Sequence, residues 1–157
     1  MENKKNKASS NGESSSYAIA EKCATVINLY EDCLDKNSFL NFRSLNISSL
    51  DIRFLMPRMK RDYDQKLIFP STLSFSFNPN IGHQGLIIIL KNLPQSVNSL
   101  GLVDCGLDDA SCLALIDYVE GTNHLRMLCV EQNNFSINSR KMLEEFRSKN
   151  SNLLIDF

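Results

Sequence analysis

Two histidines and five cysteines are the side chains most able to supply a base, a nucleophile or a metal ligand. His83 lies in a predicted turn, and His124 lies in the loop before a predicted strand. The cysteines form an odd set without a CxxC pair and without a histidine at metal-ligand spacing: Cys23, Cys33, Cys105, Cys112 and Cys129. Because the spacing of Cys129 and His124 matches no nucleophile motif, a Cys/His enzyme is the least favoured hypothesis. We therefore expect no catalytic residues, no metal and no cofactor.

Two clusters of charged residues have structural explanations as well. Asp108 and Asp109 stand at the start of an apolar helical pattern, where such residues commonly cap a helix and interact favourably with its dipole. The basic residues Arg58, Lys60 and Arg61 lie next to the acidic residues Asp62 and Asp64. This mixture of charges predicts a solvated helix surface rather than a phosphate site.

Length and composition predict one folded domain. The chain has 157 residues, of which 43% are hydrophobic, and this is enough to build a core. Its formal net charge of -1 lacks the basic excess that nucleic-acid binding needs. Residues 1–16 are nearly all Lys, Asn, Ser, Gly and Glu, which predicts a disordered tail. The longest apolar run, Leu86–Leu90, is too short to enter a membrane, and unpaired cysteines predict a reducing, cytoplasmic environment.

An apolar pattern recurs four times at nearly constant spacing, with anchors 28, 27 and 28 residues apart. A second apolar residue two positions after each anchor predicts a short strand that turns both side chains into the core. The resulting pairs are Leu45/Ile47, Leu73/Phe75, Leu100/Leu102 and Leu128/Val130. Side chains able to bond to neighbouring backbone follow the last three pairs. These side chains predict a structural ladder between adjacent turns, formed by Asn78, Cys105 and Asn133.

Helical patterns separate the predicted strands. Their apolar faces are predicted to contain Leu86, Ile89, Leu90 and Leu93, then Leu113, Ile116 and Val119, then Met142, Leu143 and Phe146. Helical spacing over 17–38 predicts a further helix that covers the N-terminal end of the core. Alternating apolar residues over 153–157 predict one more strand. The first unit is irregular, because Leu50 stands at the Asn/Cys position and Pro57 interrupts a poor helical pattern.

These units resemble the ribonuclease-inhibitor-like class of leucine-rich repeats. The resemblance covers Phe42–Phe157 and is most specific in the segments NPNIGHQG and CGLDDASCLALI. It implies an α/β fold, as a short leucine-rich-repeat solenoid of four to five units over residues 39–157. Parallel strands are expected on its concave face and helices on its convex face, with the N-terminal capping helix at 17–38 and the tail at 1–16.

Because no site for chemistry emerges, we predict a protein-protein interaction module that binds a protein partner through the concave face. The outward positions of the first predicted strand, within Ser44–Ser48, are small and polar and are expected to contribute little. We expect the partner to contact the C-terminal half of the face through Phe77, Val103, Asp104, Met127, Cys129, Glu131 and Gln132. In the alternative interpretation, small residues only let the sheet curve, and no partner binds there.

Two further hypotheses stay open. The composition is rich in Asn, Lys, Ser and Ile, and Glu144 and Glu145 precede an apolar end. These features are similar to those of short leucine-rich-repeat effectors that bacteria deliver into the host cytosol. Alternatively, the last predicted strand leaves an unpaired edge, which predicts a homo-oligomer or strand addition. Neither hypothesis names the partner.

Overall fold

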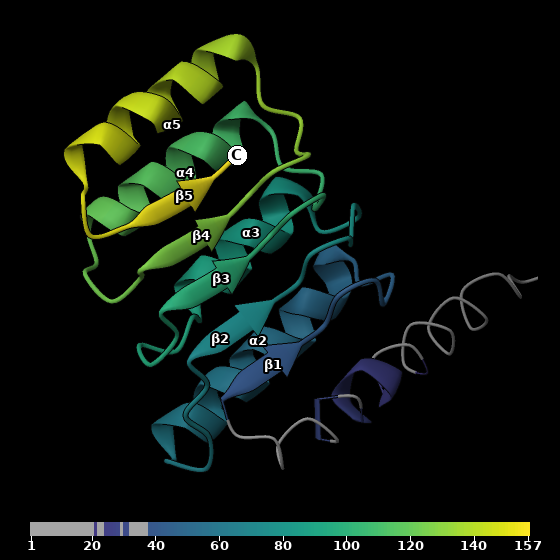
Figure 1. The fold of residues 1–157 in the computed structure, drawn as a ribbon. Helices are drawn as coiled ribbons and strands as arrows, with labels where there is room; N and C mark the ends of the chain where they lie inside the picture. Colours follow the sequence, from purple (N-terminus) through teal and green to yellow (C-terminus); the bar gives the residue numbers. More distant parts are fainter. Residues whose placement is uncertain (1–20, 22–23, 29, 32–37) are drawn as a thin grey trace, which may run out of the picture.

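The computed structural model describes residues 21, 24–28, 30–31 and 38–157 (Figure 1). The predicted disordered tail at 1–16 lies outside the described residues. Much of the predicted capping helix at 17–38 also lies outside them, but the residues described between 21 and 31 are helical. Val26 and Tyr30 of this segment are buried.

The centre of the fold is one sheet of five parallel strands, whose order in the sheet is their order in the sequence. The strands are β1 (Phe39–Asn41), β2 (Thr72–Ser74), β3 (Ser99–Gly101), β4 (Met127–Cys129) and β5 (Leu154–Asp156). Their register places one buried residue of each strand in a single row, formed by Leu40, Leu73, Leu100, Leu128 and Ile155. The α/β class and the parallel strands confirm the corresponding predictions.

A helix follows each of the first four strands. These helices are α2 (Ser49–Asp64), α3 (Gly82–Lys91), α4 (Asp109–Glu120) and α5 (Ile137–Lys149). They cover the same face of the sheet, and each packs against the next helix in the sequence (Figure 1). In the described part of the chain, no helix is long and apolar enough to cross a membrane.

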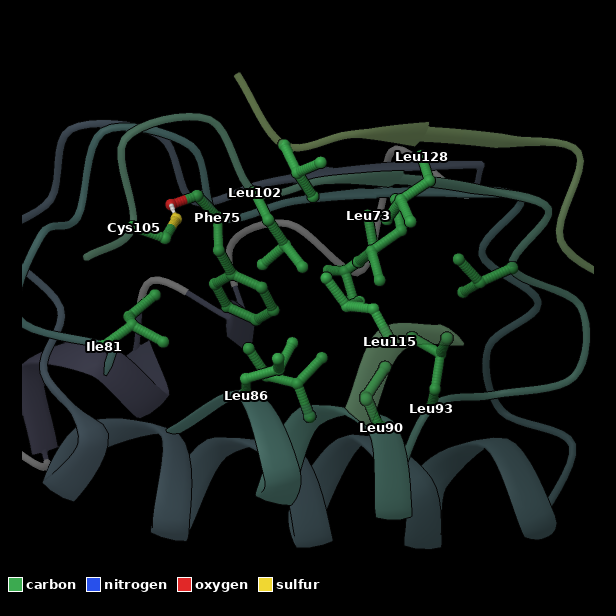
Figure 2. Close-up of a cluster of buried hydrophobic side chains, with 14 of the residues drawn as sticks. Leu73, Phe75, Ile81, Leu86, Leu90, Leu93, Leu102, Cys105, Leu115 and Leu128 are labelled. Carbon is green, nitrogen blue, oxygen red and sulfur yellow. Dashed lines mark hydrogen bonds between the residues drawn. The ribbon is translucent and has the colours of Figure 1, made fainter. Parts of the chain in front are cut away.

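The core fills the space between the sheet and the helices. Figure 2 shows Leu73, Phe75 and Leu102 pointing from the strand side toward Leu86 and Leu90 of α3. All five side chains are at least nine-tenths buried. This packing fixes the face that each strand turns away from the helices, because strand side chains alternate.

The predicted apolar faces are correct for α3 and partly correct for the next two helices, in which Val119, Leu143 and Phe146 are buried as predicted. In α4, Leu113 is 50% exposed, whereas Cys112 and Leu115 are buried. In α5, Met142 is 40% exposed, whereas the predicted Phe146 is buried. The buried face of α4 therefore contains Cys112 and Leu115 together with Val119. Cys112 is a small apolar side chain that periodicity underrates, and its thiol donates to the Ser139 carbonyl at 3.6 Å.

The first strand begins earlier than predicted. β1 pairs with β2 through Leu40 and Leu73, so the buried pair of the first strand is Leu40 and Phe42 rather than Leu45 and Ile47. Ile47 is buried as predicted, but it lies between the strand and α2. With Leu40 opposite Leu73, the Phe42 ring stacks on the Phe75 ring, with 5.3 Å between the ring centroids. This aromatic contact favours the observed register. Leu45 lies in the turn after the strand and is 39% exposed.

The corrected register lengthens the first unit to 33 residues, from Leu40 to Leu73. The extra length is used by α2, which has 16 residues and continues through Pro57. Its buried side chains include Ile52, Leu55 and Met59, so the segment is amphipathic despite the proline.

Candidate binding groove on the open face of the sheet

The open face is the surface of the sheet turned away from α2–α5. One row of outward side chains contains Phe39, Thr72, Ser99, Met127 and Leu154, and the next contains Asn41, Ser74, Gly101, Cys129 and Asp156. Small residues on β2 and β3 lie between larger ones on β1 and β4, which leaves a groove of about 390 Å³. The groove is lined by Phe39, Arg43, Thr72, Ser74, Ser76, Phe77, Ser99, Gly101, Val103, Cys129, Glu131 and Gln132.

The floor of the groove consists of small side chains that are already hydrogen-bonded. Ser76 is almost fully buried, and its hydroxyl oxygen accepts hydrogen bonds from the Ser74 hydroxyl at 3.3 Å and the Val103 N–H at 3.2 Å. Gly101 adds no side chain, and a Cβ there would lie 2.8 Å from Ser74 Oγ. The floor is therefore well packed, and polar contacts with a ligand fall mainly to the sides.

One side of the groove, here called the β1 wall, consists of Phe39, Arg43 and Phe77. Phe39 is 47% exposed, and the Arg43 guanidinium lies over the Phe77 ring at 4.7 Å from the centroid. Such a cation–π contact keeps the cation at the aromatic surface while leaving its N–H groups accessible. The wall thus combines exposed apolar area with one positive charge.

The opposite side, here called the β4 wall, consists of Cys129, Glu131 and Gln132. One carboxylate oxygen of Glu131, Oε2, is shielded from solvent and has no hydrogen-bond partner among the described residues. Burial raises the pKa of the Cys129 thiol, and the negative charges of Glu131 and Asp156 raise it further, while Arg43 acts in the opposite direction. Cys129 is therefore a neutral thiol at physiological pH, and the charge of this wall is that of Glu131.

The chain turns in the same way after each of the first four strands. Ser44, Phe77, Asp104 and Gln132 each lie four residues after the buried row and adopt positive φ values of 57°, 64°, 48° and 60°. None of them is glycine, and a bulky residue such as Phe77 adopts this conformation rarely. The repeated turn brings Phe77 and Gln132 to the two walls of the groove.

The groove contains five of the seven predicted partner-binding residues, namely Phe77, Val103, Cys129, Glu131 and Gln132. Met127 is 38% exposed on β4 but lies outside the lining, and Asp104 lies in the turn after β3, also outside it.

Sequence reasoning missed Phe39 and Arg43, and it wrongly gave the outward positions of the first strand to the segment Ser44–Ser48. Both errors follow from the displaced first strand. The alternation of Leu40 and Phe42 directly before the predicted strand was a signal for the correct register.

Asn78 connects the first two turns through a buried side chain. Its Oδ1 accepts hydrogen bonds from the Leu45 N–H at 3.1 Å and the Ile47 N–H at 2.9 Å. Its Nδ2 donates to the Phe42 carbonyl at 2.8 Å and the Phe75 carbonyl at 2.6 Å. One amide therefore satisfies backbone groups of two neighbouring units.

Asn133 makes the equivalent connection between the third and fourth turns. Its Oδ1 accepts from the N–H groups of Cys105 at 2.9 Å and Leu107 at 3.0 Å. Its Nδ2 donates to the carbonyls of Leu102 and Val130, both at 2.8 Å. Both asparagines are largely or fully buried, so water cannot replace these bonds.

Cys105 occupies the ladder position between the second and third turns, but its chemistry is weaker. Its thiol donates to the Phe75 carbonyl at 3.3 Å (Figure 2). A thiol is a weak donor and a poor acceptor, so it cannot reproduce the bonds of an asparagine amide. Burial raises the pKa of this thiol to about 12.

Each of the two histidines has a hydroxyl group as a neighbour. His124 Nε2 lies 3.4 Å from the Tyr118 hydroxyl. His83 Nδ1 lies 3.3 Å from Ser111 Oγ, and that hydroxyl is committed to Asp108 Oδ1 at 2.7 Å within the predicted helix cap. Among the described residues, no group of three or more His, Cys, Asp and Glu side chains is placed to hold a metal ion.

A larger hollow of about 610 Å³ lies where α2, α3 and α4 end. Its charged lining residues are Lys60, Asp64 and Lys91, and the ammonium of Lys60 pairs with Asp64 at 2.8 Å. Carbonyl groups at helix C-termini attract cations, so Lys91 at the end of α3 has a structural partner. This hollow therefore offers less unpartnered charge than the open-face groove.

No known protein-family model matches the chain, and no curated protein sequence matches it significantly. The groove and the sheet that supports it are therefore the features of this protein that indicate a function.

Proposed function

We propose that the chain is a leucine-rich-repeat protein of the ribonuclease-inhibitor-like class, built as a short solenoid. The support is the sequential order of the strands, with buried-row residues 33, 27, 28 and 27 positions apart, and one helix after each of the first four. The equivalent roles of Asn78 and Asn133 also support it, because repeated units need repeated connections.

We propose that this solenoid is a non-catalytic module that binds a protein partner through its concave, open face. One observation carries the proposal: the groove has an aromatic and cationic wall on β1 and a carboxylate wall on β4, across a floor of small residues. A rigid sheet presents these groups without an ordering cost on binding. The area of five short strands is below the roughly 800 Å² per partner of a standard interface, so a tight partner also contacts the loops.

A pair of tryptophan substitutions tests this proposal. Ser99→Trp fills the groove from its floor, whereas Ser148→Trp makes the same change on the exposed surface of α5. Both variants and the wild type are used to capture proteins from a cytosolic extract, and bound proteins are compared by quantitative mass spectrometry. We expect partners that the wild type and Ser148→Trp retain and that Ser99→Trp loses by at least about tenfold. Equal capture by all three proteins would contradict binding in the groove.

The second candidate function is self-assembly through the edge of the sheet. β5 is the outer strand, and Leu154 on it is 49% exposed. Leu154→Lys places a charge at this edge, a change that discourages strand pairing. A concentration-dependent dimer in sedimentation analysis that this variant abolishes would favour the edge over the groove. Delivery of the protein into a host cytosol stays a prediction from composition alone.

A further inference from the structure

We infer that the groove receives a short extended segment of the partner, with an acidic side chain against Arg43 and a basic side chain against Glu131. This inference rests on the proposed function and adds the chemistry of the segment that is recognised. Its basis is the distribution of charge within the groove, the state of the Glu131 carboxylate and the dimensions of the floor.

Among the described residues, Arg43 and Glu131 are the only charged ones that line the groove, and they lie on opposite walls. The structure shows no ion pair between them, and the described residues supply neither with another salt-bridge partner. The backbones of β1 and β4 are three strand spacings apart, about 14 Å, and the Arg43 side chain reaches inward over the Phe77 ring. The two charges are therefore separate points of contact that lie closer together than the strands themselves. A ligand with complementary charges at its two ends is therefore preferred over one with a single kind of charge.

The carboxylate of Glu131 has an unsatisfied requirement that a cation fulfils. Its Oε2 is shielded from water and lacks a hydrogen-bond donor in the described part of the protein. A buried carboxylate oxygen without a donor costs free energy, which a lysine or arginine of the partner offsets. On the other wall, the Arg43 guanidinium lies over the Phe77 ring, and Phe39 lines the same wall. The acidic end of the segment is therefore accompanied by an apolar side chain.

The floor of the groove determines how the partner segment binds. The backbone of β2 and β3 is paired on both sides within the sheet, so a segment in the groove binds through side chains and not by strand addition. A volume of about 390 Å³ holds only a few side chains. An extended chain rises about 3.3 Å per residue and turns alternate residues to one side. The two charged residues are thus expected two or four positions apart in the segment.

Defined peptides test this pattern. The probes are fluorescein-labelled ten-residue peptides on an alanine–serine background, each with one leucine and two charged residues at all spacings from one to six. Three sets carry Glu with Arg, two Glu, or two Arg, and fluorescence anisotropy measures their affinity for the full chain. We expect Glu/Arg peptides with spacings of two or four to bind at least about tenfold more tightly than the other sets.

Charge reversal provides the matched controls. Glu131→Lys is expected to shift the preference to the two-Glu set, and Arg43→Glu is expected to shift it to the two-Arg set. The double variant with both changes restores a groove of opposite charges, so it is expected to recover the preference for Glu/Arg peptides. Both side chains point to the groove and neither contributes to the core, so all three variants are expected to fold.

Ser99→Trp distinguishes two hypotheses, namely that the groove binds a ligand and that the ligand carries opposite charges. If it abolishes peptide binding while the charge-reversed variants keep the wild-type preference, the charge inference is wrong and the groove stands as a binding site. If peptides bind equally to Ser99→Trp, they bind elsewhere, and the groove itself is refuted. If no peptide binds with a Kd below about 1 mM, the extended-segment inference is overturned. The protein-capture experiment then decides the proposed function independently.

Discussion

At the scale of single residues, the three ladder positions are equivalent in the fold, but their side-chain hydrogen bonds differ in strength. Asn78 and Asn133 each satisfy backbone N–H and C=O groups in two units, whereas the Cys105 thiol makes only weak hydrogen bonds, to the carbonyls of Phe75 and Val103. The difference is chemical, because a carboxamide has donors and acceptors and a thiol has little of either. Side-chain type at these positions therefore indicates how firmly adjacent units are joined.

The importance of the asparagine connections is measurable. Asn133→Ala leaves buried N–H groups of Cys105 and Leu107 without an acceptor, so we expect the free energy of unfolding to fall by about 2 to 4 kcal/mol. The neighbouring, exposed Asn134→Ala serves as the control and is expected to cost less than about 0.5 kcal/mol. Urea denaturation followed by circular dichroism measures both. Similar values for the two variants would show that the side-chain bonds contribute no net stability.

Cys105 also makes stability depend on alkaline pH. Burial raises the pKa of its thiol to about 12 from an ordinary value of 9.0. Between these values the unfolded chain loses the proton and the folded chain keeps it, so stability is complete below pH 9 and falls as the pH rises above it.

Comparison of Cys105→Ala with the wild type isolates this effect. We expect the wild type to lose up to about 1.4 kcal/mol more per pH unit than the variant between pH 9 and 10.5, in urea titrations at each pH. Parallel pH profiles for the two proteins would mean that the thiol of Cys105 ionises as readily in the folded state as in the unfolded state.

At the scale of secondary-structure elements, the sequence was sufficient where the pattern repeats and insufficient where it does not. The regular spacing from Leu73 onward predicted β2, β3 and β4, and the alternation over 153–157 predicted β5. Each of these strands carries a buried apolar residue at the same place in its unit, which leaves a regular apolar signal in the sequence. The first strand was misplaced because Leu45 and Ile47 imitate the signal that Leu40 and Phe42 also give, and the contact of Phe42 with Phe75 favours the register of Leu40.

The same limitation explains which parts of the groove were predictable. Glu131 and Gln132 were found because they follow a correctly placed strand. Arg43 was missed because its strand was misplaced, and its position over Phe77 is a contact between units that periodicity does not contain. The positive φ of Phe77 and Gln132 was equally invisible, since neither is a residue type that signals such a turn.

The corrected register of the first strand gives a direct test. Leu40 is buried in the row shared by all strands, so Leu40→Ala is expected to reduce the free energy of unfolding by about 2 to 5 kcal/mol. Leu45→Ala removes the same atoms from a side chain that is 39% exposed and is expected to cost less than about 1 kcal/mol. Chemical denaturation measures the unfolding free energy of both variants. A larger loss for Leu45→Ala than for Leu40→Ala would support the strand predicted around Leu45.

At the scale of the whole molecule, the two ends of the sheet differ in what packs against them. At the β1 end, the buried Tyr30 hydroxyl donates to Asp62 of α2 at 3.0 Å, and Arg58 pairs with both Asp62 and Glu31. These contacts join the helical segment near residue 30 to the first unit. At the opposite end, β5 forms the edge of the sheet in the described part of the chain.

The contact of Tyr30 with Asp62 provides a test of how firmly that end is closed. Tyr30→Phe removes a hydrogen bond to a buried carboxylate and is expected to cost about 1.5 to 3 kcal/mol of unfolding free energy. The matched control is Tyr63→Phe, because the structure gives the Tyr63 hydroxyl no hydrogen bond among the described residues. We expect it to cost less than about 0.5 kcal/mol. Thermal and urea unfolding measure the stability of both variants. Equal losses of unfolding free energy would argue against a specific role for the Tyr30 hydroxyl.

The cysteine in the ladder also has a consequence for the motions of the protein. Asn78 ties the first unit to the second and Asn133 ties the third to the fourth, so the weakest of the three ladder connections lies between β2 and β3. In the proposed solenoid, partial unfolding separates neighbouring units where their interface is least stable. Amide hydrogen exchange is therefore expected to be faster at this seam than on either side of it. The groove spans the same seam, so a ligand held between Arg43 and Glu131 would act as a clamp that slows the opening of the two halves.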